Sequence, residues 1–394
     1  MVIISKAVII VVNSVNHSRM KVIYINASFN GNIHEIVDSA LIGMSVAEFH
    51  VKGYAHADRI PCLQKIIDER FPKRNIEWSA IRPIRNTKLR TLKIALREAM
   101  IILKNRGDNL FLVSFMNGFS SNLHNLICFF SGAKILLVTH NDAECLMANK
   151  RLGFQKTLHR FFFKYVPLAK NLRILVLGDS IIDNLSLHIS SKRLKHFVSI
   201  DHPYYSNVVS SQPHLRDEIN IGLPGRMDSR PSRGFDNLCK FAKDVACDNR
   251  IKIHLISSIE DKLVSKLPEN VIVKNDAGRN PSREEYEDLI KQMDYILLPY
   301  HKDYYKLTAS GAVFEAIVNL KPALMFSTDY FQYLSKKYGD FGIFIDQTKN
   351  DQLLKMLHDE RLYDNFTHKE TEIAKAINPV DLSDSFCSLI NSLW

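Results

Sequence analysis

The sequence predicts an α/β protein of two domains, each built on a parallel β-sheet with flanking helices. Short β-branched runs alternate with amphipathic helical patterns along almost the whole chain, which is typical of βαβ units. The chain has 394 residues, enough for two or three domains of ordinary size. A polar stretch at residues 201–217, with two prolines and no sustained periodicity, separates similar halves.

The first half is expected to contain buried strands separated by helices. Amphipathic helical patterns occupy residues 92–103 and 123–130, where apolar side chains recur at helical spacing. Runs rich in β-branched and aliphatic residues predict strands at 21–26, 110–115, 134–138 and 173–177.

The second half repeats this alternation. Its clearest helix starts at Ser282, because Ser282 and Glu285 form a capping box and apolar side chains follow at i, i+3, i+4 and i+7. A terminal amphipathic helix is expected within 381–394, and its apolar side must cover a face elsewhere in the molecule. Strands are predicted at 219–223, 251–256, 271–273, 295–298 and 323–326.

These elements predict four segments. They are an N-terminal Rossmann-like domain at 1–205, a linker at 206–217, a second Rossmann-like domain at 218–375 and a C-terminal helix at 376–394. Ligands of such sheets bind in the crevice outside the carboxyl ends of the strands. Candidate site residues are therefore sought in the loops that follow strands.

Composition narrows the class of partner. Lys and Arg total 52 against 42 Asp and Glu, a formal charge of +10, which favours a nucleic acid, an acidic membrane surface or a phosphorylated small molecule. The six cysteines are widely spaced without a Cys-x-x-Cys pair, so neither a zinc site nor a disulfide framework is predicted. The apolar stretch at 2–12 contains Lys6 and is too short to span a membrane. No cleavage site of small residues follows it, so we expect a cytoplasmic protein.

Two basic stretches indicate contact with an anionic surface. Residues 150–173 contain seven Lys or Arg and no acid, with aromatic residues interleaved, a composition that suits a helix lying on a membrane. Residues 82–106 contain eight basic residues and only one acid, Glu98. A solvated helical face is the alternative for each stretch. No nucleic-acid reader motif accompanies them, which disfavours a nucleic-acid partner.

The stretch 294–326 is the most informative part of the sequence. A strand ends at Pro299, a polar and aromatic loop follows, and Ser310-Gly311-Ala312 opens a helix with Glu315 in its first turns. Small residues at a helix N-terminus let a phosphate approach the backbone N–H groups. A carboxylate one turn later can accept the hydroxyls of a ribose. Alternatively, Glu315 is simply a favourable partner of the helix dipole.

The stretch 219–243 adds two cations to the same predicted cleft. A strand runs into Gly225-Arg226, and Arg233-Gly234 precedes an amphipathic helix. Guanidinium groups bind phosphate oxygens bidentately and keep their charge. A pair of solvated surface arginines is the alternative.

The order of these motifs resembles the nucleotide-binding domain of GT-B glycosyltransferases, in particular the large retaining family with a Glu-x7-Glu motif. The matching features are Gly-Arg, a basic residue before Gly, a strand that ends in Leu-Pro, and a Gly-containing helix start followed by Glu-Ala and Lys-Pro. In this sequence they lie at 225–226, 233–234, 294–299 and 310–322.

The resemblance implies a role for each of these residues. Arg226 and Arg233 bind the donor diphosphate, Ser310 and Gly311 present backbone amides to it, and Glu315 holds the nucleotide ribose. The family's first Glu, which contacts the donor sugar, is Leu307 here, so retention of the anomeric configuration stays open. The polar candidates for the missing contact are Lys302, Asp303, Lys306 and Ser310, and Lys306 is our choice as a donor-binding residue.

The first half resembles the acceptor domain of these enzymes, and the C-terminal helix is expected to return to it. His140 follows a strand, where the family often carries a His near the donor sugar, and Asp142 or Glu144 is a candidate base if the enzyme inverts. A His that only caps its loop is the alternative. The loop at 28–32 stands where the family has a glycine-bearing loop, and His-Pro-Tyr at 202–204 resembles the segment before its linker.

The resemblance therefore implies a glycosyltransferase that moves a sugar from a nucleotide-diphosphate donor to a hydroxyl of a glycan or lipid-linked glycan, as in polysaccharide assembly. We expect catalysis by positioning and charge stabilisation, with no metal and no other cofactor. A cytoplasmic location, with peripheral contact at the inner face of an anionic membrane, is expected. The alternatives are a sugar-nucleotide epimerase or hydrolase of the same fold, and a non-catalytic membrane-binding protein.

Overall fold

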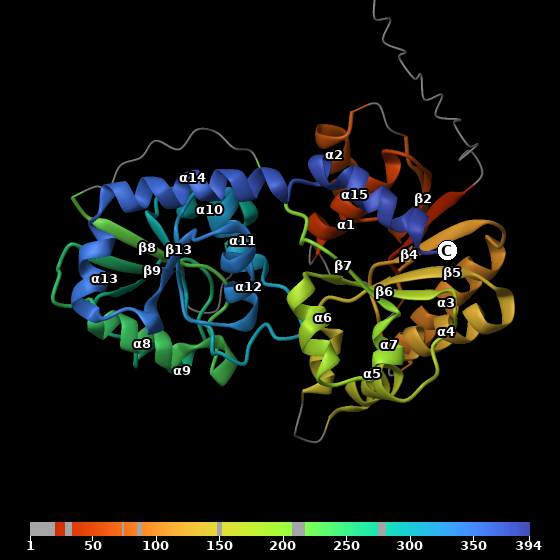
Figure 1. Cartoon of the computed structure of the whole chain (residues 1–394), viewed down its shortest axis with the longest axis horizontal. Helices are drawn as coiled ribbons and strands as arrows, with labels where there is room; N and C mark the ends of the chain where they lie inside the picture. Colours follow the sequence, from red (N-terminus) through yellow and green to blue (C-terminus); the bar gives the residue numbers. More distant parts are fainter. Residues whose placement is uncertain are drawn as a thin grey trace, which may run out of the picture.

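The chain forms two parallel sheets with helices on both faces of each, joined by segments that run between them (Figure 1). The computed structural model describes residues 20–27, 34–72, 75–84, 89–147, 152–206, 217–274 and 281–394. The apolar stretch at 2–12, the loop at 28–32 and residues 207–216 of the expected linker lie outside this part.

The first sheet has seven strands in the order β3-β2-β1-β4-β5-β6-β7, all parallel. Its strands are β1 (Lys21–Ile25), β2 (His50–His56), β3 (Glu77–Ile81), β4 (Asn109–Val113), β5 (Lys134–Val138), β6 (Leu172–Leu177) and β7 (Phe197–Ile200). The chain order reverses between β1 and β4, and ligands of such sheets bind at this switch point.

The second sheet has six parallel strands in the corresponding order β10-β9-β8-β11-β12-β13. Its strands are β8 (Ile219–Leu223), β9 (Ile251–Leu255), β10 (Val271–Val273), β11 (Tyr295–Leu298), β12 (Ala323–Met325) and β13 (Gly342–Phe344). The switch point here lies between β8 and β11, the strands that precede Arg226 and the 299–310 loop.

Helices cover both faces of the first sheet. One face packs against α3, α4 and α5 and the other against α1, α2 and α15, each through its own apolar cluster. The helices of this half are α1 (Glu35–Val46), α2 (Ile60–Arg70), α3 (Arg90–Lys104), α4 (Gly118–Ser131), the 3-10 helix η1 (Asp142–Leu146), α5 (Phe154–Lys164), α6 (Asp179–Ser186) and α7 (Ser191–Leu194).

The second half has its own helical layers. They are formed by η2 (Pro231–Arg233), α8 (Phe235–Asp244), α9 (Asp261–Val264), α10 (Arg283–Lys291), α11 (Gly311–Val318), α12 (Asp329–Tyr338), η3 (Ile345–Gln347), α13 (Asn350–Leu357) and α14 (Glu360–Ala376). The predicted capping box of α10 is present: Ser282 Oγ accepts from the Glu285 N–H at 3.2 Å, and Glu285 Oε2 accepts from the Ser282 N–H at 2.7 Å.

The final helix, α15 (Pro379–Ser392), leaves the second half and packs on the first, as predicted (Figure 1). Phe386 and Ile390 lie in the apolar cluster that contains Leu41 and Met44 of α1. The Cys387 thiol also donates to the Met44 carbonyl at 3.3 Å. The chain thus connects the two halves a second time, and its last helix becomes part of the core of the first half.

The predicted two-sheet architecture is confirmed, but four strands have no counterpart in the sequence prediction: β2, β3, β7 and β13. Strand β2 has Gly53 at its centre and His at both ends, so it does not read as a β-branched run. Gly53 is required by packing, because a Cβ there would lie 2.3 Å from the Trp78 ring on β3. Strands β3 and β7 are edge strands, and β13 has only three residues.

Candidate functional site

The loops that follow β5 and β11 meet between the two sheets. Glu144 Oε1 accepts from the Leu307 N–H at 3.2 Å, and the Thr308 hydroxyl donates to the His140 carbonyl. From α6, the Asn184 amide donates to the Lys306 carbonyl at 2.9 Å. His140, Glu144 and the 299–310 loop, which sequence patterns singled out separately, are therefore neighbours where the two halves meet, at the position of the predicted cleft.

The N-terminus of α11 is open on the second-half side of this cleft. Gly311, its first residue, is exposed, and a Cβ placed there would meet no atom within 4 Å. Ser310, the N-cap, is fully buried, and its hydroxyl does not cap the helix. The first N–H groups of α11 are thus available to an anion approaching past Gly311.

Arg226 lies in the loop after β8, next to this helix start in the topology. Its side chain is exposed and forms no hydrogen bond or ion pair with any residue that the structure describes. An exposed arginine with no carboxylate partner keeps its full donor capacity for a ligand. No contact among the described residues holds the Arg226 side chain in one position.

Arg233 ends η2, in the same connection between β8 and α8 as Arg226. Its side chain is 21% exposed, and its Nε lies 4.0 Å from Asp228 Oδ2, too far for a hydrogen bond. Arg230 takes that carboxylate instead, through Nε and Nη2 at 2.8 and 2.6 Å, and lowers the pKa of Asp228 to about 2. The Arg233 guanidinium stands 5.8 Å from the Tyr304 ring centroid. Arg233 is therefore held in place by its surroundings but underused as a hydrogen-bond donor, because its Nε–H has no acceptor among the described residues.

Gly234 fixes the position of Arg233. Its φ is 76°, in the left-handed region, and a Cβ there would lie 1.7 Å from the Pro299 carbonyl oxygen. Only glycine lets η2 approach the end of β11 this closely. The Arg-Gly pair noted in the sequence thus has a steric reason for its second member.

Glu315 is buried one turn into α11, but the structure gives it two protein partners. Its Oε1 accepts from the Tyr204 hydroxyl and from Arg283 Nη1, the latter at 3.0 Å. Burial lowers the pKa of Arg283, but Glu315 and Tyr204 more than offset this and leave it raised. Both bonds go to Oε1. Sequence reasoning did not anticipate Arg283 or Tyr204, because they lie in the first turn of α10 and in the interdomain segment.

Leu307 stands where the resembling family has its first Glu, and its side chain is 1% exposed within the apolar cluster of the first domain. The loop before it includes Tyr305, buried with a φ of 58°, an unfavourable conformation for a bulky residue. Lys306 pairs with Asp303 at 2.8 Å, and this carboxylate raises the pKa of the lysine. The 299–310 loop thus anchors the second half to the first.

His140 lies on the first-half wall of the cleft. Its Nε2 is 3.1 Å from the Ser114 carbonyl, so Nε2 carries the proton and Nδ1 is left as an acceptor. Burial and the nearby imidazoles of His34 and His202 lower its pKa well below the usual value, which keeps the ring neutral. The His34 ring stacks on the His140 ring, with the two ring centroids 3.8 Å apart. His34 has a φ of 67° at the start of α1 and was not predicted.

Asp142 and Glu144, the candidate bases, are both engaged within the fold. Asp142 Oδ2 accepts from the Thr139 hydroxyl and the His140 N–H at 3.4 Å each, and Oδ1 is 3.5 Å from His159 Nδ1. Burial raises the pKa of Asp142 to about 6 and lowers that of His159 to about 4. Asp142 thus holds its own loop at the start of η1, and Glu144 holds the Leu307 amide.

A buried polar network supports the His140 wall from behind. The Asp38 carboxylate, 0% exposed, accepts from Asn26 Nδ2 at 3.0 Å, from Arg59 Nη2 at 2.7 Å and from the Ser114 hydroxyl. Ser114 is the residue whose carbonyl fixes His140. These residues follow β1 and β4 or lie on neighbouring helices, so the network gathers at the switch point of the first sheet. A buried ion pair is a weak stabiliser, which favours a positioning role.

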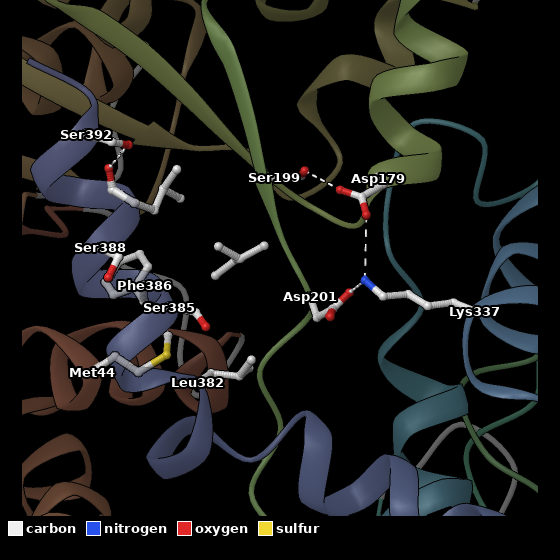
Figure 2. Close-up of a pocket in the computed structure, with 12 residues that line it drawn as sticks. Met44, Asp179, Ser199, Asp201, Lys337, Leu382, Ser385, Phe386, Ser388 and Ser392 are labelled. Atoms are coloured by element: carbon white, nitrogen blue, oxygen red, sulfur yellow. Dashed lines mark hydrogen bonds and ion pairs between the residues drawn. The ribbon is translucent and has the colours of Figure 1, made fainter. Parts of the chain in front are cut away.

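A cavity of about 500 Å³ lies away from these residues, where the chain crosses between the halves (Figure 2). It is lined by serines of α15 and by Asp179, Asp201 and Lys337, whose Nζ is 2.6 Å from Asp201 Oδ1 and 3.6 Å from Asp179 Oδ2. None of the sequence-predicted site residues lines it. Across the described ranges, no three His, Cys, Asp or Glu side chains gather in a way that could hold a metal ion.

Comparisons of the whole chain agree with the sheet topology. HepE of Anabaena, solved with UDP and glucose, superposes with a TM-score of 0.63 over 95% of this chain and 100% of that chain, at 11% identity. The chain has the GT-B fold. Sucrose-phosphate synthase of Thermosynechococcus elongatus gives a TM-score of 0.63, 12% identity, and coverage of 95% and 98%. TarM of S. aureus superposes with a TM-score of 0.55 at 16% identity, over 77% of this chain and 58% of that chain.

These identities, 11–16%, establish the architecture alone. No family model matches the sequence, and no curated protein matches it. In the described part, no helix combines the length and apolar character that crossing a membrane requires. The GT-B architecture predicted from ordered motifs is thus confirmed, while the role of each residue stays a prediction.

Proposed function

We propose that this protein is a glycosyltransferase that moves a hexosyl group from a nucleotide-diphosphate donor to a hydroxyl of a glycan or lipid-linked glycan, as in cell-surface polysaccharide assembly. The observation that carries the proposal is the second-half wall of the cleft. The open N-terminus of α11, the unpaired Arg226 and the underused Arg233 belong to segments that follow β8 and β11, the two strands at the switch point of a GT-B sheet. This arrangement suits a diphosphate better than any other common ligand.

The chemistry follows from where charge develops. As the bond between the anomeric carbon and the diphosphate breaks, negative charge grows on the leaving oxygen. Arg233 and the first amides of α11 stabilise that charge from fixed positions, and the exposed Arg226 adds a second guanidinium that can turn toward it. Lys306, 31% exposed in the adjoining loop, adds a further cation. The rest of the rate comes from holding donor and acceptor in line, with no metal required.

The nucleoside is held by Glu315. Its Oε1 is occupied by Tyr204 and Arg283, and Oε2 accepts the ribose hydroxyls. The ion pair with Arg283 and the hydrogen bond from the Tyr204 hydroxyl hold this carboxylate in place. HepE has been solved with UDP-glucose, and a TarM variant with UDP and α-GlcNAc-glycerol, which supports UDP as the first nucleotide to test.

On the first-half wall, His140 accepts a hydrogen bond from a sugar hydroxyl through Nδ1. This assignment rests on the Nε2 proton being directed to the Ser114 carbonyl. Asp142 is a positioning residue for the His140 loop, since both of its oxygens face that loop or His159. Measuring the anomeric configuration of the product by NMR decides between retention and inversion.

The proposal is tested by thermal shift and calorimetry with UDP, GDP, ADP and CMP, because binding to the native state raises its melting temperature. Arg226→Ala and Glu315→Ala should lose the response to the preferred nucleotide. Arg250→Ala is the matched control, because Arg250 is an exposed arginine paired with Asp248 outside the cleft loops. No response of the wild type to any nucleotide contradicts the proposal.

Leu307 favours a second candidate, a non-catalytic GT-B protein that binds a membrane. A family position for a sugar-binding Glu is occupied here by a core residue. Incubation with UDP-sugars, with and without acceptor, separates the possibilities. Transfer to an acceptor supports the glycosyltransferase, and nucleotide release without an acceptor supports an epimerase or hydrolase. Nucleotide binding without any turnover supports the non-catalytic protein.

Activity retained in EDTA supports the metal-independent mechanism. We also propose a cytoplasmic location with peripheral contact to an anionic membrane.

A further inference from the structure

The outward sides of α3, α4 and α5 form one apolar surface on the first domain, which we name the α3–α5 face. Across the described residues, fourteen large hydrophobic side chains are strongly exposed, and ten of them belong to this face. They are Leu89, Leu96, Met100, Leu103, Leu126, Phe129, Phe130, Phe154, Phe161 and Tyr165. A concentration of this kind on a monomer marks an interaction surface.

Helix α3 is apolar on two opposite sides. Ile94, Ala99 and Ile102 face the sheet and are buried. The solvent side carries Leu96 and Met100, 50% and 53% exposed, with Leu89 two turns before Leu96 and Leu103 one turn after Met100. Because these positions are spaced by three, four or seven residues, they form one stripe along the helix. A helix that only covers a core places polar residues there.

The same surface continues over α4 and α5. Phe130 on α4 is 85% exposed, more than any other large hydrophobic residue in the described ranges. Phe119 of α4 contacts Phe154 of α5, with ring centroids 5.7 Å apart. From α5, the Gln155 amide donates to the Thr91 hydroxyl of α3 at 3.0 Å. The three helices therefore form one continuous layer on one side of the sheet, opposite α1, α2 and α15 (Figure 1).

The charge of this layer has one sign. Helices α3, α4 and α5 carry seven Lys or Arg and a single acid, Glu98. Glu98 is 0% exposed and accepts from the Ser120 hydroxyl at 2.6 Å, so it faces inward. Lys93, Lys104, Lys156 and Lys164 are exposed beside the apolar side chains. The solvent-facing surface is thus apolar and cationic without a compensating carboxylate.

We propose that the α3–α5 face docks on an anionic lipid bilayer, with its aromatic and aliphatic side chains in the interface and its lysines at the headgroups. This occupant satisfies both properties of the face at once. A second copy of the chain would place cationic surface against cationic surface, which disfavours a symmetric dimer. A nucleic acid would use the charge but leave the phenylalanines without a partner.

Docking here would set the acceptor beside the cleft, a consequence that rests on the proposed function. Helix α5 supports the His140 loop directly, because His159 on α5 lies 3.5 Å from Asp142 Oδ1. The N-terminus of α4 is bound to the same helix through the Gly118 N–H and Gln155 Oε1 at 3.0 Å. An acceptor presented by a lipid at the bilayer surface would therefore enter near His140.

The test is vesicle co-sedimentation of the full chain, with phosphatidylcholine alone and with added phosphatidylglycerol. The wild type should bind the anionic vesicles at least about tenfold more strongly than the neutral ones, and added salt should weaken this binding. Phe129→Ser/Phe130→Ser and Leu96→Gln/Met100→Gln should each lose most of it. Lys93→Glu/Lys156→Glu should lose the preference for anionic lipid.

The matched control is Val380→Gln/Ile272→Gln, two exposed apolar residues on α15 and β10, outside the face. It should bind vesicles as the wild type does. Unchanged binding of both apolar double variants overturns the proposal, as does a wild type that binds neither vesicle. A dimer that Phe129→Ser/Phe130→Ser converts to monomer also overturns it, because the face then joins copies. UDP titration of each variant tests the donor site separately: vesicle binding without nucleotide binding rejects only the proposed function.

Discussion

The two walls of the cleft differ in how their polar groups are satisfied. On the first-half wall, Asp38 accepts from three side chains, and His140 is fixed between Ser114 and His34. On the second-half wall, Arg226 has no described partner and Gly311 faces open space. A wall whose polar side chains bond one another keeps its shape, whereas one with spare donors can receive an anion. This difference is the reason why we propose positioning for the first half and donor binding for the second.

The largest expected effect breaks the first-half wall. Asp38→Ala leaves Arg59 buried without its carboxylate and should lower the free energy of unfolding by about 3–5 kcal/mol. Urea unfolding measures this loss. The double variant Asp38→Leu/Arg59→Met should be less destabilised than the single one, because no unpaired charge remains. Equal losses in both would show that packing, and not the buried charge, governs this site.

A second effect on the same wall depends on pH. The pKa of Asp142 is raised to about 6 in the folded protein, so the folded state holds this proton more tightly than the unfolded state. At low pH the carboxyl is protonated in both states, so it does not lower the free energy of unfolding. As pH rises from about 4 to 6, its ionisation lowers that free energy by at most about 3 kcal/mol. Asp142→Asn should be stabilising above that range and near neutral below it, as urea unfolding at several pH values would show. A pH-independent difference would contradict this assignment.

On the donor wall, Arg233→Ala should act on the ligand and spare the fold. Removing a charged hydrogen-bond donor to the diphosphate should weaken UDP binding by about 1.5–3 kcal/mol. The free energy of unfolding should fall by at most about 1 kcal/mol, because Arg233 makes no good ion pair and loses only its contact with the Tyr304 ring. Calorimetry and urea unfolding of one preparation measure both. Arg230→Ala, which removes the bidentate partner of Asp228, should show weaker effects on UDP.

The smallest expected effect sharpens the contrast further. Gly311→Val adds bulk where the free protein has room, so stability should change little. The same side chain should obstruct the approach of phosphate to the α11 amides and weaken UDP binding, by roughly tenfold. Gly234→Ala is the counterpart, because a Cβ there meets the Pro299 carbonyl and should destabilise the fold itself. If Gly311→Val lowered stability and left UDP affinity intact, the α11 site would be wrong.

The sequence was informative where neighbours in space are also neighbours in the chain. The strands β5, β8, β10 and β11 were predicted to the residue, because each is a short run of apolar and β-branched side chains. The candidate donor wall could be proposed from the sequence because Arg226, Arg233 and Glu315 each stand in a local motif after a strand. Arg283 could not be linked to Glu315 in this way, since its place beside that carboxylate depends on how α10 packs.

Most contacts of the first-half wall could not be predicted from the sequence. Asp38 lies within helix α1, where an acidic residue ordinarily faces water, and Arg59 precedes α2. Only the fold brings them to Ser114 and His140, which follow different strands. Leu307 was noticed as a missing Glu, but its insertion into the core of the opposite domain is a tertiary property.

The most direct test of the two-wall account is a crystal structure of the protein with UDP. We predict the diphosphate within hydrogen-bond distance of the Gly311 N–H and the Arg226 guanidinium, with the ribose on Glu315 and the His140 wall unchanged. UDP bound instead in the cavity beside Asp201 and Lys337 would contradict the account. So would a bound UDP that touches neither arginine nor the start of α11.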